Sequence, residues 1–143
     1  MKISDIQRYD SEKMYGAYEK WPEIAQENYK KDLSKIEFKN VDHIVFAGVG
    51  GSGTIGDVMS SILSKTDIHV NVVKGYLLPK TVGPNTLVVT TSVSGNSKEA
   101  LSILQNARKS EGKFVAFSSG GKMKKFSTKN NISYIEIPEI HSP

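Results

Sequence analysis

Two short segments of the sequence combine glycine with hydroxyl side chains, and each stands between an apolar run and a helical pattern. The first reads GVGGSGT over residues 48–54, and the second reads SVSGNS over residues 92–97. Glycines let a ligand approach the backbone, and a helix N-terminus offers unpaired amides and the positive end of the helix dipole. Because serine and threonine hydroxyls add further donors, both segments predict binding of a small anion such as a phosphate group.

The first segment also matches, by letter, the dinucleotide fingerprint G-x-G-x-x-G through Gly48, Gly50 and Gly53. A nicotinamide site needs in addition an Asp or Glu about 20 residues later, which holds the ribose hydroxyls. The next apolar run ends in VVKGY, without an acid, and its Lys74 would at best favour a 2′-phosphate. A nucleotide P-loop is excluded because that motif has a lysine directly before its Ser or Thr, whereas Gly53 stands directly before Thr54. We therefore predict that the chain binds no dinucleotide and uses no cofactor.

An ordinary helix cap is the structural alternative for the first segment, with Ser52 or Thr54 as the capping residue. The adjacent glycines Gly50 and Gly51 are more than a cap requires, and they favour the anion site.

The second segment supplies three hydroxyls within six residues, from Ser92, Ser94 and Ser97. A role for these serines in a turn alone is the structural alternative. Asn96 and Glu99 have the spacing of a capping box, which predicts that the following helix begins at Ser97 and explains Glu99 structurally. The hydroxyls and free amides would then converge on one point.

The elements that must position these segments can be predicted from the hydrophobic pattern. Apolar residues at i, i+3 and i+4 predict helices after the first and third strands, and a loop over residues 77–85 replaces the helix after the second. Continuous rather than alternating apolar runs are typical of a parallel sheet covered on both faces. Five β-branched runs predict the strands, at residues 43–48, 69–73, 86–92, 113–119 and 133–138.

These elements predict a doubly wound α/β fold with a five-stranded parallel sheet of flavodoxin-like order 2-1-3-4-5. In that order the loops after strands one and three flank the topological switch point, where ligands bind. Residues 1–40 read as a polar helical arm, with Pro22 at a first helical position and an apolar stripe that can dock on a sheet. Residues 41–143 read as one globular unit. The stripe comprises Ile24, Ala25, Asn28, Tyr29, Leu33 and Ile36.

The motifs GVGGSG and SVSGNSKE, in this order and spacing, resemble the paired phosphate loops of the sugar isomerase (SIS) domain family. The form GVGGSGTIGD, preceded by a helical arm with WPE, is most similar to the first half of the bifunctional phosphoglucose/phosphomannose isomerases. Ser97 stands where the family usually has Thr, so the hydroxyl is preserved. The resemblance implies that a hexose 6-phosphate is bound by Gly50, Gly51, Ser52, Ser92, Ser94 and Ser97.

The resemblance also implies that catalytic groups are missing. In the family an arginine follows a proline about where this chain stops at HSP, and the glutamate base and the ring-opening histidine belong to a second domain. His141 and Glu139 are the local acid–base candidates, and Lys122 is a third. His43 and His69 begin strands at the opposite end and are expected to be structural.

We therefore expect part of an isomerase of glucose 6-phosphate, mannose 6-phosphate and fructose 6-phosphate. It would become catalytic only with a second SIS half, supplied by a longer parent chain or in trans, and we expect a SIS-type dimer. A non-enzymatic phosphosugar-binding or regulatory module is the alternative. The coding sequence downstream would discriminate between the two.

Composition excludes several other classes of protein. The 143 residues contain no cysteine and only three scattered histidines, so no protein-built metal site is expected. No apolar stretch approaches the ~18 residues that cross a bilayer, and the N-terminus has no apolar signal core, so we expect a cytoplasmic protein without a membrane partner. The net charge of +4 includes a lysine cluster at residues 122–129, which indicates a solvated helix face rather than a nucleic-acid surface.

Overall fold

The computed structural model describes residues 3–30 and 36–139, and these fall into two compact units. The first unit is helical, and its last helix begins at Trp21, so that Pro22 is the second helical residue rather than the first. Leu33 of the expected apolar stripe lies outside the described residues, and docking of this stripe on a sheet stays a prediction. The helices of this unit are α1 (Ile3–Tyr9), α2 (Met14–Glu19) and α3 (Trp21–Lys30).

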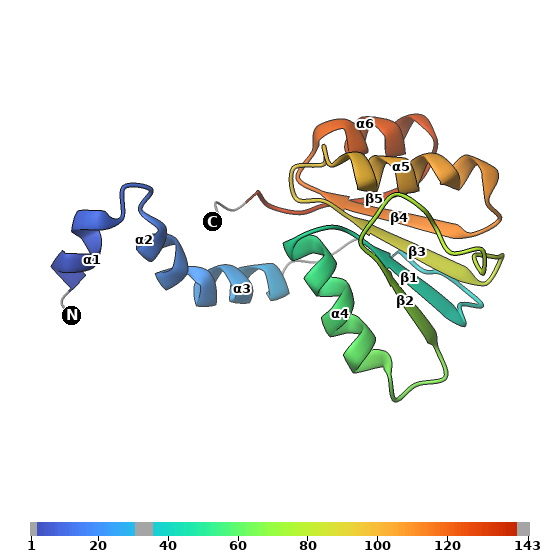
Figure 1. Cartoon of the computed structure of the whole chain (residues 1–143), viewed down its shortest axis with the longest axis horizontal. Coiled ribbons are helices and arrows are strands. Elements are labelled where there is room, and N and C mark those ends of the chain that lie inside the picture. The colour runs from blue at the N-terminus through green and yellow to red at the C-terminus, as the bar shows by residue number, and fades with distance from the viewer. Residues whose placement is uncertain (1–2, 31–35, 140–143) are drawn as a thin grey trace. The chain divides into compact units, whose positions relative to one another are not determined.

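The second unit, residues 36–139, is built on a parallel five-stranded sheet (Figure 1). Its strand order is β2-β1-β3-β4-β5, which confirms the predicted topology. All five strands begin at the predicted residues; β2 also ends where predicted, and the other four end one or two residues earlier. The strands are β1 (His43–Ala47), β2 (His69–Val73), β3 (Thr86–Thr91), β4 (Lys113–Ser118) and β5 (Ser133–Glu136).

Helices cover the two faces of the sheet unequally. Figure 1 shows α5 (Lys98–Asn106) and α6 (Gly121–Lys129) on one face and α4 (Gly51–Leu63) on the other. The core lies under α5 and α6 because apolar side chains of the central strands meet those of both helices there. A short 3₁₀ helix (Ala107–Lys109) follows α5, and the segment between β2 and β3 forms no helix, as predicted. The largest fully buried apolar side chains of this core are Val45, Val88, Ile103, Leu104 and Met123.

Gly56 allows α4 to lie close to the sheet. A Cβ atom on Gly56 would stand 2.9 Å from Cβ of Phe46 and 3.0 Å from Cγ1 of Val72, closer than side chains normally approach. The helix axis can therefore approach β1 and β2 at this point without a clash. This contact holds the first turn of α4, and with it the first glycine-rich loop, next to the end of β1.

Candidate functional site

The first loop turns sharply between β1 and α4. The amide of Gly48 donates to the carbonyl of Val73 at 3.0 Å, which ties the loop to the end of β2. Gly50 then occupies the N-cap position with φ of +59°, a conformation that favours glycine. A Cβ atom on Gly53 would stand 2.7 Å from the carbonyl oxygen of Gly48, so the turn depends on glycine there as well.

Neither hydroxyl of the first loop caps its helix. The N-cap of α4 is Gly50 and has no side-chain cap bond, while Oγ1 of Thr54 donates back to the carbonyl of Gly50 at 3.3 Å. The interpretation of Ser52 or Thr54 as a helix cap is therefore wrong. Ser52 is half-buried in the first turn of α4, and Gly50 and Gly51 are exposed, so their backbone is open to a ligand.

The second loop closes on itself at the end of β3. Ser92 is buried, and its amide donates to the carbonyl of Phe117 at 3.1 Å, while the amide of Gly95 donates to the carbonyl of Ser92 at 3.0 Å. Ser94 is exposed, and its Oγ accepts the Asn96 amide at 3.3 Å. Ser94 thus has the turn role considered from the sequence, with its hydroxyl still open to solvent.

Ser97 occupies the N-cap of α5 without capping it. The helix begins at Lys98, and the Ser97 side chain makes no cap bond. Within the part of the chain that the structure describes, Oγ of Ser97 is buried and has no hydrogen-bond partner. A buried hydroxyl without a partner costs about 1–3 kcal/mol, a cost that an acceptor on a ligand at the N-terminus of α5 would offset.

The predicted capping box is wrong in both of its residues. The amide group of Asn96 donates to the carbonyl of Ser94 at 3.0 Å, and its Oδ1 accepts the backbone amide of Lys122 at 3.2 Å. Asn96 therefore bridges to the loop after β4 instead of capping α5. The pKa of Glu99 lies below its ordinary value because its own backbone amide and the Tyr76 hydroxyl stabilise the charged carboxylate.

Strand pairing brings the two loops to one edge of the sheet. Ala47, the last residue of β1, is in register with Val73 on one side and with Thr90 on the other. Because the strands are parallel, the loops after β1 and β3 leave the same edge side by side, and α4 and α5 begin there. Their N-termini make this edge favourable for an anion.

Two charged or polar residues after β2 also lie beside these loops. Nζ of Lys74 pairs with Oδ2 of Asp57 in α4 at 2.6 Å, so its charge is already balanced by a carboxylate. Tyr76 contacts α5, where its carbonyl accepts the Ser102 hydroxyl at 3.1 Å and the Glu99 carboxylate raises the pKa of its own hydroxyl. Tyr76 could not be predicted as part of this region because a tyrosine after a strand carries no local signal of the helix that it will contact.

The weaker acid–base candidates are Glu139, His141 and Lys122, of which the structure describes Glu139 and Lys122. Glu139 is exposed, with Oε2 at 3.5 Å from Oγ of Ser119, and His141 lies outside the described residues. The side chain of Lys122 is exposed on α6. Across residues 3–30 and 36–139, no group of three metal-ligating side chains occurs. No helix in the same ranges is long and apolar enough to span a membrane.

The fold and the loops first define the class of protein, a doubly wound α/β domain with two glycine–serine loops at one edge of its sheet. Tagatose-6-phosphate ketose/aldose isomerase from Escherichia coli has this fold, with a TM-score of 0.56 and 21% identity over 71% of this chain and 30% of its own. The sugar isomerase domain of the RpiR transcription factor from Sphaerobacter thermophilus matches with a TM-score of 0.52 and 16% identity, over 61% of this chain and 52% of its own. These likenesses show the fold alone.

The model of the SIS domain matches residues 37–141, and the chain belongs to the SIS domain family, as its motifs predicted. The bifunctional phosphoglucose/phosphomannose isomerase of Caldicellulosiruptor bescii is 36% identical over 126 residues, which are 85% of this chain. The enzyme of the same name from Aquifex aeolicus is 34% identical over 92% of this chain. The chain spans 37% and 38% of the lengths of these two relatives. It is therefore a SIS domain related to phosphosugar isomerases.

Proposed function

We propose that this chain is the sugar-phosphate-binding part of an aldose–ketose isomerase. The reaction would interconvert glucose 6-phosphate or mannose 6-phosphate with fructose 6-phosphate in the cytoplasm. The observation that carries the proposal is the buried hydroxyl of Ser97 at the N-terminus of α5, for which residues 3–30 and 36–139 supply no hydrogen-bond partner. A phosphate oxygen would supply the acceptor that this hydroxyl lacks. The ligand set that we propose is Gly50, Gly51, Ser52, Ser92, Ser94 and Ser97.

Two features of the site suit a monophosphate better than a pyrophosphate or a free sugar. The N-termini of α4 and α5 both begin at this edge and favour one compact negative charge. Serine hydroxyls and glycine amides bind phosphate oxygens without a metal ion. Lys74, which would favour a nucleotide 2′-phosphate, is occupied by Asp57.

Isomerisation needs more than this phosphate site. An acid and a base must open the sugar ring, a base must move a proton between C1 and C2, and donors must stabilise the enediolate. The chain has two arginines. Arg8 lies in α1 of the helical unit, and Arg108 lies in the 3₁₀ helix that follows the end of α5 away from Ser97. We propose that a second SIS half, in a longer chain or a dimer partner, supplies these groups.

Calorimetric titration with glucose 6-phosphate and with inorganic phosphate tests the site. Ser97→Ala should weaken binding by about tenfold because it removes one hydrogen bond to a charged group. Ser127→Ala is the matched control: Ser127 also has a buried hydroxyl without a partner among the described residues, but it lies within α6. The control should bind like the wild type. Wild-type affinity in Ser97→Ala would contradict the proposed site.

A further inference from the structure

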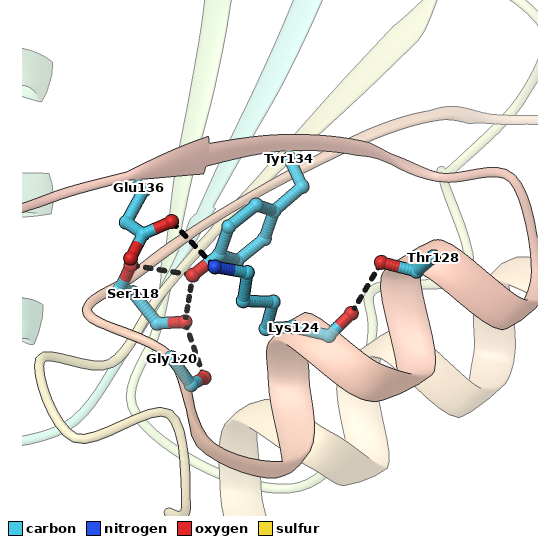
Figure 2. A network of polar contacts seen from close by, with 6 residues as sticks. All are labelled: Ser118, Gly120, Lys124, Thr128, Tyr134 and Glu136. Atoms are coloured by element: carbon cyan, nitrogen blue, oxygen red, sulfur yellow. Dashed lines mark hydrogen bonds and ion pairs between the residues drawn. The ribbon is translucent and has the colours of Figure 1, made fainter.

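A polar network joins β5 to the turn between β4 and α6 (Figure 2). The hydroxyl of Tyr134 donates to the carbonyl of Ser118 at 2.7 Å and lies 3.1 Å from the Ser118 hydroxyl. Oγ of Ser118 in turn donates to the carbonyl of Gly120 at 2.9 Å. Ser118 has no exposed surface, so this chain of bonds is protected from competing water.

Gly120 is in direct contact with the second loop of the candidate site. The carbonyl oxygen of Gly120 occupies the space that a side chain on Gly95 would need. In the same way, the carbonyl oxygen of Ser94 occupies the space that a side chain on Gly121 would need. The backbones of the two loops therefore touch without intervening side chains. Any displacement of Gly120 must be followed by Gly95, because nothing compressible lies between them.

Four hydrogen bonds hold the same two loops together, one of them from Oγ of Ser119 to the carbonyl of Val93 at 2.8 Å. The amide of Ser119 donates to the carbonyl of Val93 at 2.8 Å, and the amide of Met123 donates to the carbonyl of Gly95 at 2.9 Å. Lys122 adds the bond from its amide to Asn96. The turn after β4 thus fixes the conformation of residues 93–96. These residues include Ser94 and immediately precede Ser97.

We propose that Tyr134 is a positioning residue for the anion-binding loop. Acting through Ser118 and Gly120, its hydroxyl sets the position of Gly95 and so the alignment of the Ser94 and Ser97 hydroxyls. This inference rests on the proposed function, since it concerns the affinity of the same site. Tyr134 is remote from the loop in sequence and touches it only through the two intermediate residues.

The test compares Tyr134→Phe with Glu136→Gln in the full chain. Tyr134→Phe keeps the ring and removes only the hydroxyl. Glu136→Gln removes the 2.6 Å ion pair between Glu136, which lies on β5 with Tyr134, and Lys124 on α6 (Figure 2). The side chains of this ion pair do not reach residues 93–96. The ligands are glucose 6-phosphate and inorganic phosphate, and amide hydrogen exchange at Gly95 and Met123 is recorded without ligand.

Tyr134→Phe should weaken binding of both ligands by roughly three- to tenfold and speed exchange at both amides, as expected for one lost hydrogen bond. Glu136→Gln should change neither. Ser118→Ala should have a similar effect, and the double variant should lose no more than the larger single loss, because both residues act through Gly120. If Tyr134→Phe does not fold, Ser118→Ala alone decides the outcome.

Unchanged affinity in Tyr134→Phe and Ser118→Ala would overturn the inference even if either variant melts at a lower temperature. If the wild type binds and Ser97→Ala binds weakly while Tyr134→Phe binds normally, only the inference is lost. If the wild type binds neither ligand, the proposed function and the inference are both wrong.

Discussion

The hydroxyl of Tyr76 interacts with the carboxylate of Glu99 and stabilises its charged form, which couples the segment after β2 to the first turn of α5. The carbonyl of Tyr76 also accepts the Ser102 hydroxyl at 3.1 Å, one turn further along that helix. Two contacts from one residue therefore anchor a segment that has no helix of its own. Both lie beside the Ser97 end of α5.

The first prediction concerns the pH dependence of this anchor. The pKa of Glu99 is lowered in the folded chain by its backbone amide and by Tyr76, so its contribution to stability is present above the ordinary glutamate pKa. It should be lost as the pH falls through the lower, folded-state pKa. Urea unfolding across this range should show Glu99→Gln less stable than the wild type at neutral pH, with the difference vanishing in acid. A difference that persists in acid would contradict this.

The second prediction concerns the contact between the two loops. Gly95→Ala should destabilise the fold by about 2 kcal/mol or more, because alanine is strained at its φ of +66° and its Cβ would meet the carbonyl of Gly120. Gly75→Ala is the control, since Gly75 has nothing within 4 Å of its Cβ position. That change should stay within about 0.5 kcal/mol. Equal unfolding midpoints for the two variants would argue against the contact.

The third prediction compares the contributions to stability of the two histidines that begin β1 and β2. His43 is buried, with Nδ1 at 3.0 Å from Oγ1 of Thr86 and Nε2 at 2.8 Å from Oδ1 of Asn71. Because Oδ1 of Asn71 can only accept, the ring donates through Nε2, and Nδ1 of the neutral ring accepts the Thr86 hydroxyl. His43→Ala should cost about 2–4 kcal/mol through the cavity and the unpaired partners.

His69, whose ring centroid lies 4.9 Å from that of His43, provides the comparison. It is exposed, so His69→Ala should change the free energy of unfolding by less than about 0.5 kcal/mol. Denaturant titration of both variants measures this. A larger loss from His69→Ala than from His43→Ala would reverse the assignment of the structural histidine.

The fourth prediction is that the chain alone converts fructose 6-phosphate to glucose 6-phosphate near the background rate. A missing acid or base costs about 10²- to 10⁴-fold, and a missing stabiliser of developing negative charge costs a similar factor. A coupled assay should show turnover recovering when a second SIS half that carries these groups is added. Ordinary enzyme rates from the chain alone would make Glu139 and His141 the first residues to substitute.

The sequence by itself determined the framework of the α/β unit. The apolar runs at 43–48, 86–92 and 113–119 indicate strands that are buried on both faces of a sheet. The two glycine–serine segments come at the ends of the first two of these runs. Parallel pairing and right-handed crossovers leave few ways to order such strands, so the order and the edge that carries both loops follow from local patterns. The same patterns indicated Gly50, Ser94 and Ser97 as site residues.

The tertiary structure alone decided which polar groups of the site are already satisfied. Asn96 has the spacing of a helix cap, yet it bonds to Lys122 because the loop after β4 lies against it. Ser97 keeps a buried hydroxyl without a partner among the described residues, and Tyr134 reaches Ser118 from another strand. Periodicity records which face of an element is buried, whereas a hydrogen bond between loops depends on where distant elements bring their backbones into contact.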